Sequence, residues 1–129
     1  KKNELLKAII ANRRNLKKIV KIVHPEVQSR MNNFIKKNKN KKIVILDIPL
    51  LMENKINKKN DILIFVEAKK KEINKKLKKR ENYNSKIFYK LKKLQLPLEI
   101  KKKKSNLIIK NNFKPNYVKK NVNNILKKF

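Results

Sequence analysis

Residues 43–53 read IVILDIPLLME, an apolar run that ends in Asp47, Pro49, a Leu-Leu pair and Glu53. An apolar run of this kind is typical of a strand buried inside a sheet. Pro49 lacks a backbone N–H, so it would stop the ladder just after Asp47. Open α/β sheets bind ligands at the carboxyl ends of their strands, and we therefore expect chemistry beside these carboxylates.

Two further apolar runs lie downstream, at residues 62–66 and 107–109. The three runs lack polar alternation, which predicts strands covered on both faces, as in a parallel α/β sheet. We expect parallel strands near 43–48, 61–67 and 106–110. About a dozen residues separate the first two strands, the minimum for a parallel crossover, and nearly forty separate the second from the third.

The rest of the chain shows helical periodicity. Apolar residues recur every three or four positions over residues 4–23, which predicts one helix or two helices broken near Asn12. Pro25 fits the first turn of a following helix, with residues 36–42 as its exit loop. Residues 69–80 and 85–104 read as two lysine-rich helices joined at 82–84. Pro115 begins a C-terminal helix whose expected inward side chains are Tyr117, Val118, Val122, Ile125, Leu126 and Phe129.

The chain is strongly basic. Its 129 residues can form one domain with a core, and they include 39 Lys and Arg against 9 Asp and Glu, a net charge of +30. A field of this strength attracts any polyanion, so nonspecific polyanion binding is expected. The excess is mostly Lys and accompanies abundant Asn and Ile, whose codons are rich in A and T. A base-biased genome and a dedicated basic binding face both explain this composition.

Several features are missing from the chain. It has no Cys and one His, which excludes a disulfide framework and a thiolate metal site. Its apolar runs are far shorter than the roughly 18 residues needed to span a bilayer, and it has no signal pattern, so we expect a cytoplasmic protein without a membrane partner. It also has no glycine, the default residue for close backbone approach to phosphate. Base bias and the loss of a front segment would both contribute to that absence.

Four segments carry a family resemblance: His24 and Pro25 in IVHPEV, residues 43–53, the stretch QLPLE at 95–99, and Asn111 with Asn112. Their order resembles that of the dephospho-coenzyme A kinases, P-loop phosphotransferases of the last step of coenzyme A synthesis, over nearly the whole chain. The family begins with a phosphate-binding loop of G-x-x-x-x-G-K-[ST] type, which a chain without glycine does not contain. The resemblance therefore implies an α/β, partial P-loop kinase-like three-layer fold with the N-terminal P-loop part absent.

The resemblance also implies an organisation and an activity. The family's sheet places the P-loop strand between the first two strands, so residues 43–46 and 62–65 should be splayed apart or poorly paired with each other. The single domain would comprise a helical coenzyme A region (1–40), core strands (41–67), a helical lid (68–105), and a last strand with a C-terminal helix (106–129). The implied activity is ATP-dependent phosphorylation of the 3′-hydroxyl of dephospho-coenzyme A, with ATP and Mg²⁺ as cofactors. This chain alone would be inactive.

Asp47 resembles a Walker-B carboxylate, which implies a catalytic role exerted indirectly through Mg²⁺. The alternative is a carboxylate that caps the following turn. The resemblance assigns five residues to the substrate side: His24, Pro25, Leu50, Leu51 and Glu53. For His24 and Glu53 the alternative is an ordinary helix-start residue, and the resemblance does not make His24 the proton acceptor.

Arg80 is a planar, bidentate donor in a lysine-dominated helix. The resemblance implies that Arg80 faces the transferring phosphates, as a catalytic and nucleotide-binding residue of the lid. Lys76, one turn earlier, stands where the family usually has another arginine, and it keeps the charge without the fork. For both residues, a solvated basic face is the alternative.

Two segments would complete the nucleotide site. Gln95 opens a Q-x-P-x-E-x-K segment like that of the family, although Pro97 also explains it as a simple helix interruption. Asn111 and Asn112 follow the last strand, where related kinases seat the adenine, although Asn is also a common strand terminator. Phe113 replaces a family Gly.

A nonenzymatic, basic nucleic-acid-binding module is the alternative function. The charge of +30 favours it. The aromatic content of 6%, the absence of a recognised RNA- or DNA-binding signature, and apolar runs that indicate a buried sheet instead of a stacking platform disfavour it.

Overall fold

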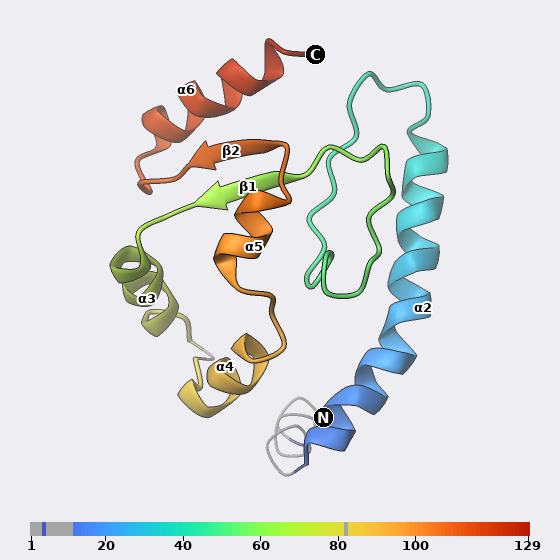
Figure 1. Cartoon of the computed structure of the whole chain (residues 1–129), viewed down its shortest axis with the longest axis vertical. Coiled ribbons are helices and arrows are strands. Elements are labelled where there is room, and N and C mark those ends of the chain that lie inside the picture. Colours follow the sequence, from blue (N-terminus) through green and yellow to red (C-terminus); the bar gives the residue numbers. More distant parts are fainter. Residues whose placement is uncertain (1–3, 5–11, 82) are drawn as a thin grey trace.

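The computed structural model describes residues 4, 12–81 and 83–129. Its elements are α2 (Arg13–Lys37), β1 (Ile64–Glu67), α3 (Lys70–Lys78), α4 (Ser85–Lys92), α5 (Leu98–Lys103), β2 (Leu107–Lys110) and α6 (Pro115–Leu126). Figure 1 shows α2 along one side of the molecule and the loop 38–63 between α2 and the pair of strands. This mixture of elements confirms the predicted α/β class.

The two strands form a parallel sheet. Ile64 lies opposite Leu107, and Glu67 lies opposite Lys110. Both strands fall inside the predicted ranges 61–67 and 106–110. The pairing is extended at its start by Asn106, whose backbone N–H donates to the Leu63 carbonyl at 2.8 Å while its side-chain oxygen accepts from the Leu63 N–H at 2.8 Å.

Neither face of the sheet is fully covered, which corrects the prediction of strands buried on both faces. Phe65 and Glu67 are the half-buried side chains of β1, and Leu107 and Ile109 are those of β2. Phe65 lies opposite Ile108, and the neighbours of Ile108 in the strand, Leu107 and Ile109, point to the other face of the sheet. The half-buried pair of β1 and the half-buried pair of β2 therefore lie on opposite faces. An ion pair joins α5 to β1, and α6 packs against β2 (Figure 1). The sheet thus has a helix on each face, as in a partial three-layer fold.

Residues 43–48 do not form the predicted strand. Their side chains alternate between exposed and half-buried, and Ile45 is 75% exposed. A strand exists only through hydrogen bonds to a neighbouring strand, and within the described residues the sheet consists of β1 and β2 alone. Residues 43–46 therefore do not pair with residues 62–65, as expected, whereas Ile64 and Phe65 pair with β2.

Helix α2 continues through Pro25, which corrects the prediction that Pro25 begins a separate helix. An interior proline removes one backbone donor and costs about 3 kcal/mol. The helix continues because its half-buried stripe stays in register across the proline, with His24, Val27 and Met31 at three- and four-residue spacing. Of the helix predicted before Asn12, only Glu4 lies within the described residues, and it is helical.

Residues 68–105 contain three helices instead of the predicted two. Helix α3 lies inside the predicted range 69–80, whereas the predicted helix 85–104 is divided into α4 and α5. Asn84 begins α4 by accepting a hydrogen bond from the Ile87 N–H at 3.1 Å. Pro97 is the N-cap of α5, with φ −51° and ψ 139°. A proline disfavours helix before it and cannot donate a ladder bond, so the interruption anticipated at Pro97 occurs.

Helix α6 begins at Pro115, as predicted. Its inward positions Val118, Val122 and Ile125 are half-buried or buried. The other three predicted inward residues are exposed: Tyr117 by 40%, Leu126 by 43% and Phe129 by 40%. A two-stranded sheet is too narrow to cover the whole apolar face of this helix.

Among the residues that the structure describes, the buried core is small. Its side chains are Met31, Ile56, Ile87 and Ile125, which come from α2, the loop 38–63, α4 and α6. The chain exposes 11,520 Å², whereas a folded monomer of 15.5 kDa exposes about 7,200 Å². Part of this excess is apolar, as at Ile22 (76% exposed) and Val66 (56% exposed). The described elements therefore leave apolar surface uncovered on the sheet and along α2.

Candidate functional site

Glu53 joins the segment 43–53 to the Q-x-P-x-E-x-K segment. Its side chain is only 8% exposed and lies in the turn that follows Pro49. The Glu53 Oε1 atom lies 2.6 Å from Lys101 Nζ and accepts a hydrogen bond from the Leu96 N–H at 2.8 Å. Burial raises the pKa of Glu53, but the hydrogen bonds from Lys101 and from backbone N–H groups outweigh it and hold that pKa below its ordinary value. The carboxylate is therefore charged and satisfied in the folded chain.

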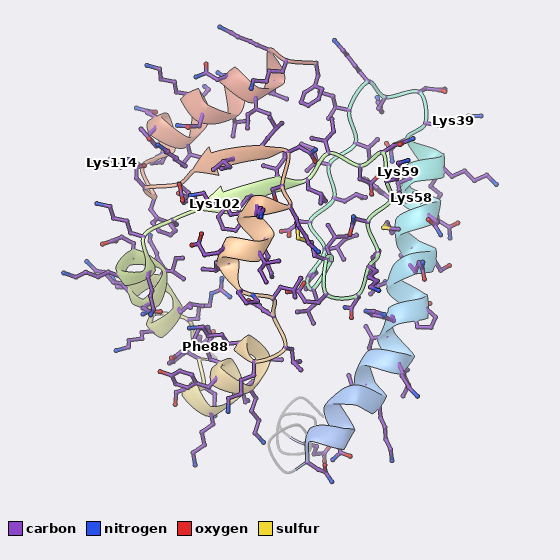
Figure 2. All side chains as sticks on the ribbon, viewed as in Figure 1. Lys39, Lys58, Lys59, Phe88, Lys102 and Lys114 are labelled. Atoms are coloured by element: carbon purple, nitrogen blue, oxygen red, sulfur yellow. The ribbon has the colours of Figure 1, made fainter. Side chains whose placement is uncertain are left out.

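A second ion pair lies at the end of β1. Lys102 of α5 donates to Glu67, and this hydrogen bond lowers the pKa of Glu67 and raises the pKa of Lys102. The backbone carbonyl of Glu67 also accepts a hydrogen bond from the Asn111 N–H at 2.7 Å. The Glu67 side chain and main chain thus fix α5 and the exit of β2 to the carboxyl end of the sheet. Figure 2 shows Lys102 beside β1.

The exit of β2 is a tight, strained loop. The Asn111 side-chain oxygen accepts from the Phe113 N–H at 2.8 Å, and the Asn112 side-chain oxygen accepts from the Lys114 N–H at 3.0 Å. These bonds hold Phe113 at a φ of 62°, in the left-handed region. For a residue with a Cβ that conformation costs about 1–3 kcal/mol. Both asparagines act as turn residues here, which is the structural role anticipated for them.

Lys76 reaches this loop from α3. Its Nζ atom lies 5.5 Å from the centre of the Phe113 ring, within the range of a cation–π contact. Between α3 and the ring is a hollow of about 290 Å³ lined by Glu72, Lys75, Lys76, Lys79 and Phe113. The structure therefore brings Lys76 beside the loop of Asn111 and Asn112.

The other predicted site residues lie on separate parts of the fold. Asp47 and Gln95 are exposed, and Arg80 is exposed just after the C-terminal end of α3. His24 is half-buried on α2, and its buried Nε2 atom has no hydrogen-bond partner among the described residues.

The remaining substrate-side residues are Pro25, which is exposed on α2, and Leu50 and Leu51, which are half-buried in the turn before Glu53. Leu50 has a φ of 57°.

Asp47 is the predicted Mg²⁺ ligand. In the part of the chain that the structure describes, no group of three or more His, Asp or Glu side chains is placed to hold a metal ion. Mg²⁺ bound with a nucleotide needs only one or two carboxylates, because phosphates and water supply the other ligands. Asp47 therefore fits a magnesium–nucleotide complex as a single ligand, and it does not form a protein cage for a free ion.

Sequence reasoning missed the role of the Phe113 ring and of Glu72, Lys75 and Lys79. Two signals were present. The spacing 72, 75, 76 and 79 places these residues on one face of a helix, and an aromatic residue directly follows the two asparagines at the end of a strand. Their meeting depended on the path of the chain between β1 and β2, which no local pattern specifies.

Parallel strands, helices on both faces of the sheet and a basic helical segment between the strands make this a mixed α/β protein, and the arrangement is consistent with a partial P-loop kinase-like fold. Across residues 4, 12–81 and 83–129, no helix combines the length and the apolarity needed to cross a membrane.

Comparisons with known proteins agree with this class. A family model described as "CoaE: Dephospho-CoA kinase" matches residues 1–116. A dephospho-CoA kinase of Bartonella quintana (strain Toulouse) is 35% identical over 108 residues, which cover 82% of this chain and 55% of that protein. A dephospho-CoA kinase of Wolbachia pipientis wMel is 32% identical over 124 residues, which cover 95% of this chain and 63% of that protein. The one from Fusobacterium nucleatum subsp. nucleatum is 31% identical over 112 residues, 86% of this chain and 57% of that protein.

The chain belongs to the dephospho-CoA kinase family. It spans a little over half the length of the curated relatives named here. None of these similarities supports the alternative of a nucleic-acid-binding module.

Proposed function

We propose that this chain forms the substrate and lid part of a dephospho-CoA kinase, which transfers the γ-phosphoryl group of ATP to the 3′-hydroxyl of dephospho-coenzyme A. The observation that supports this most strongly is the family match over residues 1–116. The contact of Lys76 with the Phe113 ring is compatible with it, because a cation of α3 then lies next to the loop that is proposed to seat the adenine.

The proposed roles follow from charge and position. Arg80 stabilises charge on the transferring phosphoryl group, because its planar fork donates two parallel hydrogen bonds. Lys76 and Lys75, the two lysines of α3 that line the hollow, neutralise the phosphates of ATP. Gln95, Asn111 and Asn112 complete the nucleotide side. Asp47 holds or orients Mg²⁺, which would neutralise phosphate charge when bound.

The substrate side lies on α2 and on the turn after residue 48. His24 and Pro25 on α2, together with Leu50 and Leu51, contact dephospho-coenzyme A in this proposal. Glu53 holds the turn through Lys101 and Leu96, so it positions the two leucines instead of bonding the substrate itself.

Residues 1–129 contain no glycine and therefore no Gly-rich phosphate cradle. The test is a fusion protein in which the P-loop part of the Wolbachia pipientis relative precedes residue 1. The fusion, incubated with γ-labelled ATP, Mg²⁺ and dephospho-coenzyme A, should yield coenzyme A labelled at the 3′-phosphate. The unfused chain should yield none.

A fusion that folds and binds ATP but transfers no label to dephospho-coenzyme A would contradict the proposal. A salt titration separates specific binding from the effect of the +30 charge. Nonspecific polyanion affinity falls steeply with salt, whereas binding of dephospho-coenzyme A should fall less. Figure 2 shows labelled lysines, such as Lys39 and Lys114, at widely separated places in the molecule.

A further inference from the structure

The hollow between α3 and Phe113 combines one aromatic ring with an excess of positive charge. One wall is formed by Glu72, Lys75 and Lys76 of α3 and by Lys79, the C-cap residue of that helix, and the Phe113 ring forms the other. An aromatic face attracts planar rings, and ammonium groups attract anions. The chemistry of this hollow therefore suits a planar base that carries a phosphate chain.

Its size points to the same ligand class. A volume of about 290 Å³ is near the lower limit of ligand pockets, which span about 300–1,000 Å³. The hollow has room for a nucleobase, with the phosphates extending along α3.

The backbone conformation of Phe113 fixes the position of its ring. Its left-handed conformation is fixed by the Asn111 side chain, so the ring stands on a rigid loop and not on a mobile one. Strain of this kind at a residue with a Cβ is common at ligand-binding sites.

The ring is already covered in the unliganded chain. Lys76 Nζ lies over the ring at 5.5 Å from its centre, so a base that stacks on this face must displace it. An exposed cation–π contact contributes about 2- to 5-fold to an equilibrium constant, whereas a base stacked on an aromatic ring contributes about 5- to 150-fold. Exchange of the ammonium for a base is therefore favourable.

We propose that Phe113 is a stacking platform for the base of ATP and that Lys76 is an exchangeable cover, which lies on the ring in the free chain and moves to the phosphates when the nucleotide binds. The choice of ATP rests on the proposed function. The platform and its cover rest on the hollow and on the Lys76–Phe113 contact.

The exchange predicts effects of opposite sign for two probes. With residues 1–129 at constant ionic strength, titration calorimetry measures the Kd of adenosine, which lacks phosphates, and of ATP. Lys76→Gln should bind adenosine about 2- to 5-fold more tightly, because the competing ammonium is gone. The same variant should bind ATP at least about threefold more weakly, because a phosphate contact is lost. Lys78→Gln, on α3 but outside the hollow, is the matched control and should leave adenosine affinity unchanged.

Phe113→Leu should weaken adenosine and ATP alike by about fivefold or more, because Leu keeps the apolar volume but has no aromatic face. Leu50 shows that leucine is accepted at a positive φ in this chain. Phe113→Tyr keeps the ring and should bind like the unchanged chain. Circular dichroism of each variant verifies folding.

Adenosine affinity that is unchanged or weaker in Lys76→Gln, or unchanged in Phe113→Leu, overturns this proposal, as does an unchanged chain that binds neither probe. The proposed function is judged separately by dephospho-coenzyme A phosphorylation in the fusion protein. If the Lys76→Gln variant changes the affinities for adenosine and ATP in opposite directions but the fusion protein does not phosphorylate dephospho-coenzyme A, the stacking role of Phe113 is supported. The proposal that dephospho-coenzyme A is the acceptor is then contradicted.

Discussion

Glu53 shows how one carboxylate connects two parts of the chain that lie far apart in sequence. Its oxygen bonds both Lys101 and the Leu96 N–H, and its side chain is only 8% exposed. A buried charge is stable only when it is paired and hydrogen-bonded, so each of these contacts matters for folding.

Glu53→Gln should lower the free energy of unfolding at pH 7 by about 1–3 kcal/mol, because Gln still accepts from Leu96 but loses the charge opposite Lys101. The folded-state pKa of Glu53 is lowered, so its stabilisation is complete above its ordinary pKa of 4.5 and is lost as pH falls through the lower folded-state value. Urea unfolding at pH 7 and near pH 3 should therefore show a difference between variant and parent that shrinks in acid.

Glu26→Gln is the matched control for that experiment. Glu26 pairs with Arg30 on the surface of α2, where its side chain is 61% exposed, and such pairs contribute about 0.3–0.5 kcal/mol. An equal loss of stability in both variants would mean that the Glu53 contacts do not stabilise the fold beyond an ordinary surface pair.

Arg80→Lys, placed in the fusion protein, should lower kcat at least about tenfold with little change in KM, because the bidentate fork bonds charge that develops in the transition state. Steady-state kinetics with dephospho-coenzyme A measures both constants. Arg30→Lys makes the same chemical change at an exposed position of α2 and should leave kcat unchanged. Equal kcat in the two variants would make Arg80 a surface residue.

At the scale of elements, α2 combines an interior proline with a continuous helix. Pro25 is exposed and interrupts the ladder on the solvent side, while Val27 and Met31 continue the half-buried stripe. The proline therefore costs helix stability without any visible gain in packing. A role in the substrate site would account for its presence.

Pro25→Ala should stabilise the chain by about 1–3 kcal/mol, because Ala restores the missing N–H and removes the clash with the preceding turn. Urea unfolding and far-UV circular dichroism measure this gain, and Ser29→Ala on the same exposed helix is the control. If Pro25 serves the substrate site, the fusion protein carrying Pro25→Ala should bind dephospho-coenzyme A more weakly. Unchanged affinity would leave Pro25 without a substrate role.

For the whole molecule, we propose one explanation for both the large exposed surface and the unpaired segment 43–48. A strand seated between residues 43–48 and β1 would pair with both and would help to cover their exposed apolar side chains, among them Ile45 and Ile64. The P-loop strand of the family has that position.

Hydrogen exchange tests this arrangement. Backbone amides of residues 43–46 should exchange about as fast as in an unfolded chain when residues 1–129 stand alone, and they should be protected in the fusion protein. Amides of the β1–β2 ladder are the internal control, because that ladder is already paired. Strong protection of residues 43–46 in the isolated chain would show that they pair without the added strand.

Local patterns were enough for part of this protein. The β1 and β2 segments, the start of α6 at Pro115 and the break at Pro97 follow from apolar runs and from the missing N–H of proline, and both properties act over a few residues. The order of the motifs was likewise enough to indicate the family. Tertiary structure decided the rest: the loss of the strand at 43–48, the continuity of α2, the Glu53–Lys101 pair and the meeting of Lys76 with Phe113. A ladder, a buried ion pair and a ring contact each need a partner from a distant part of the chain, and no local pattern contains that partner.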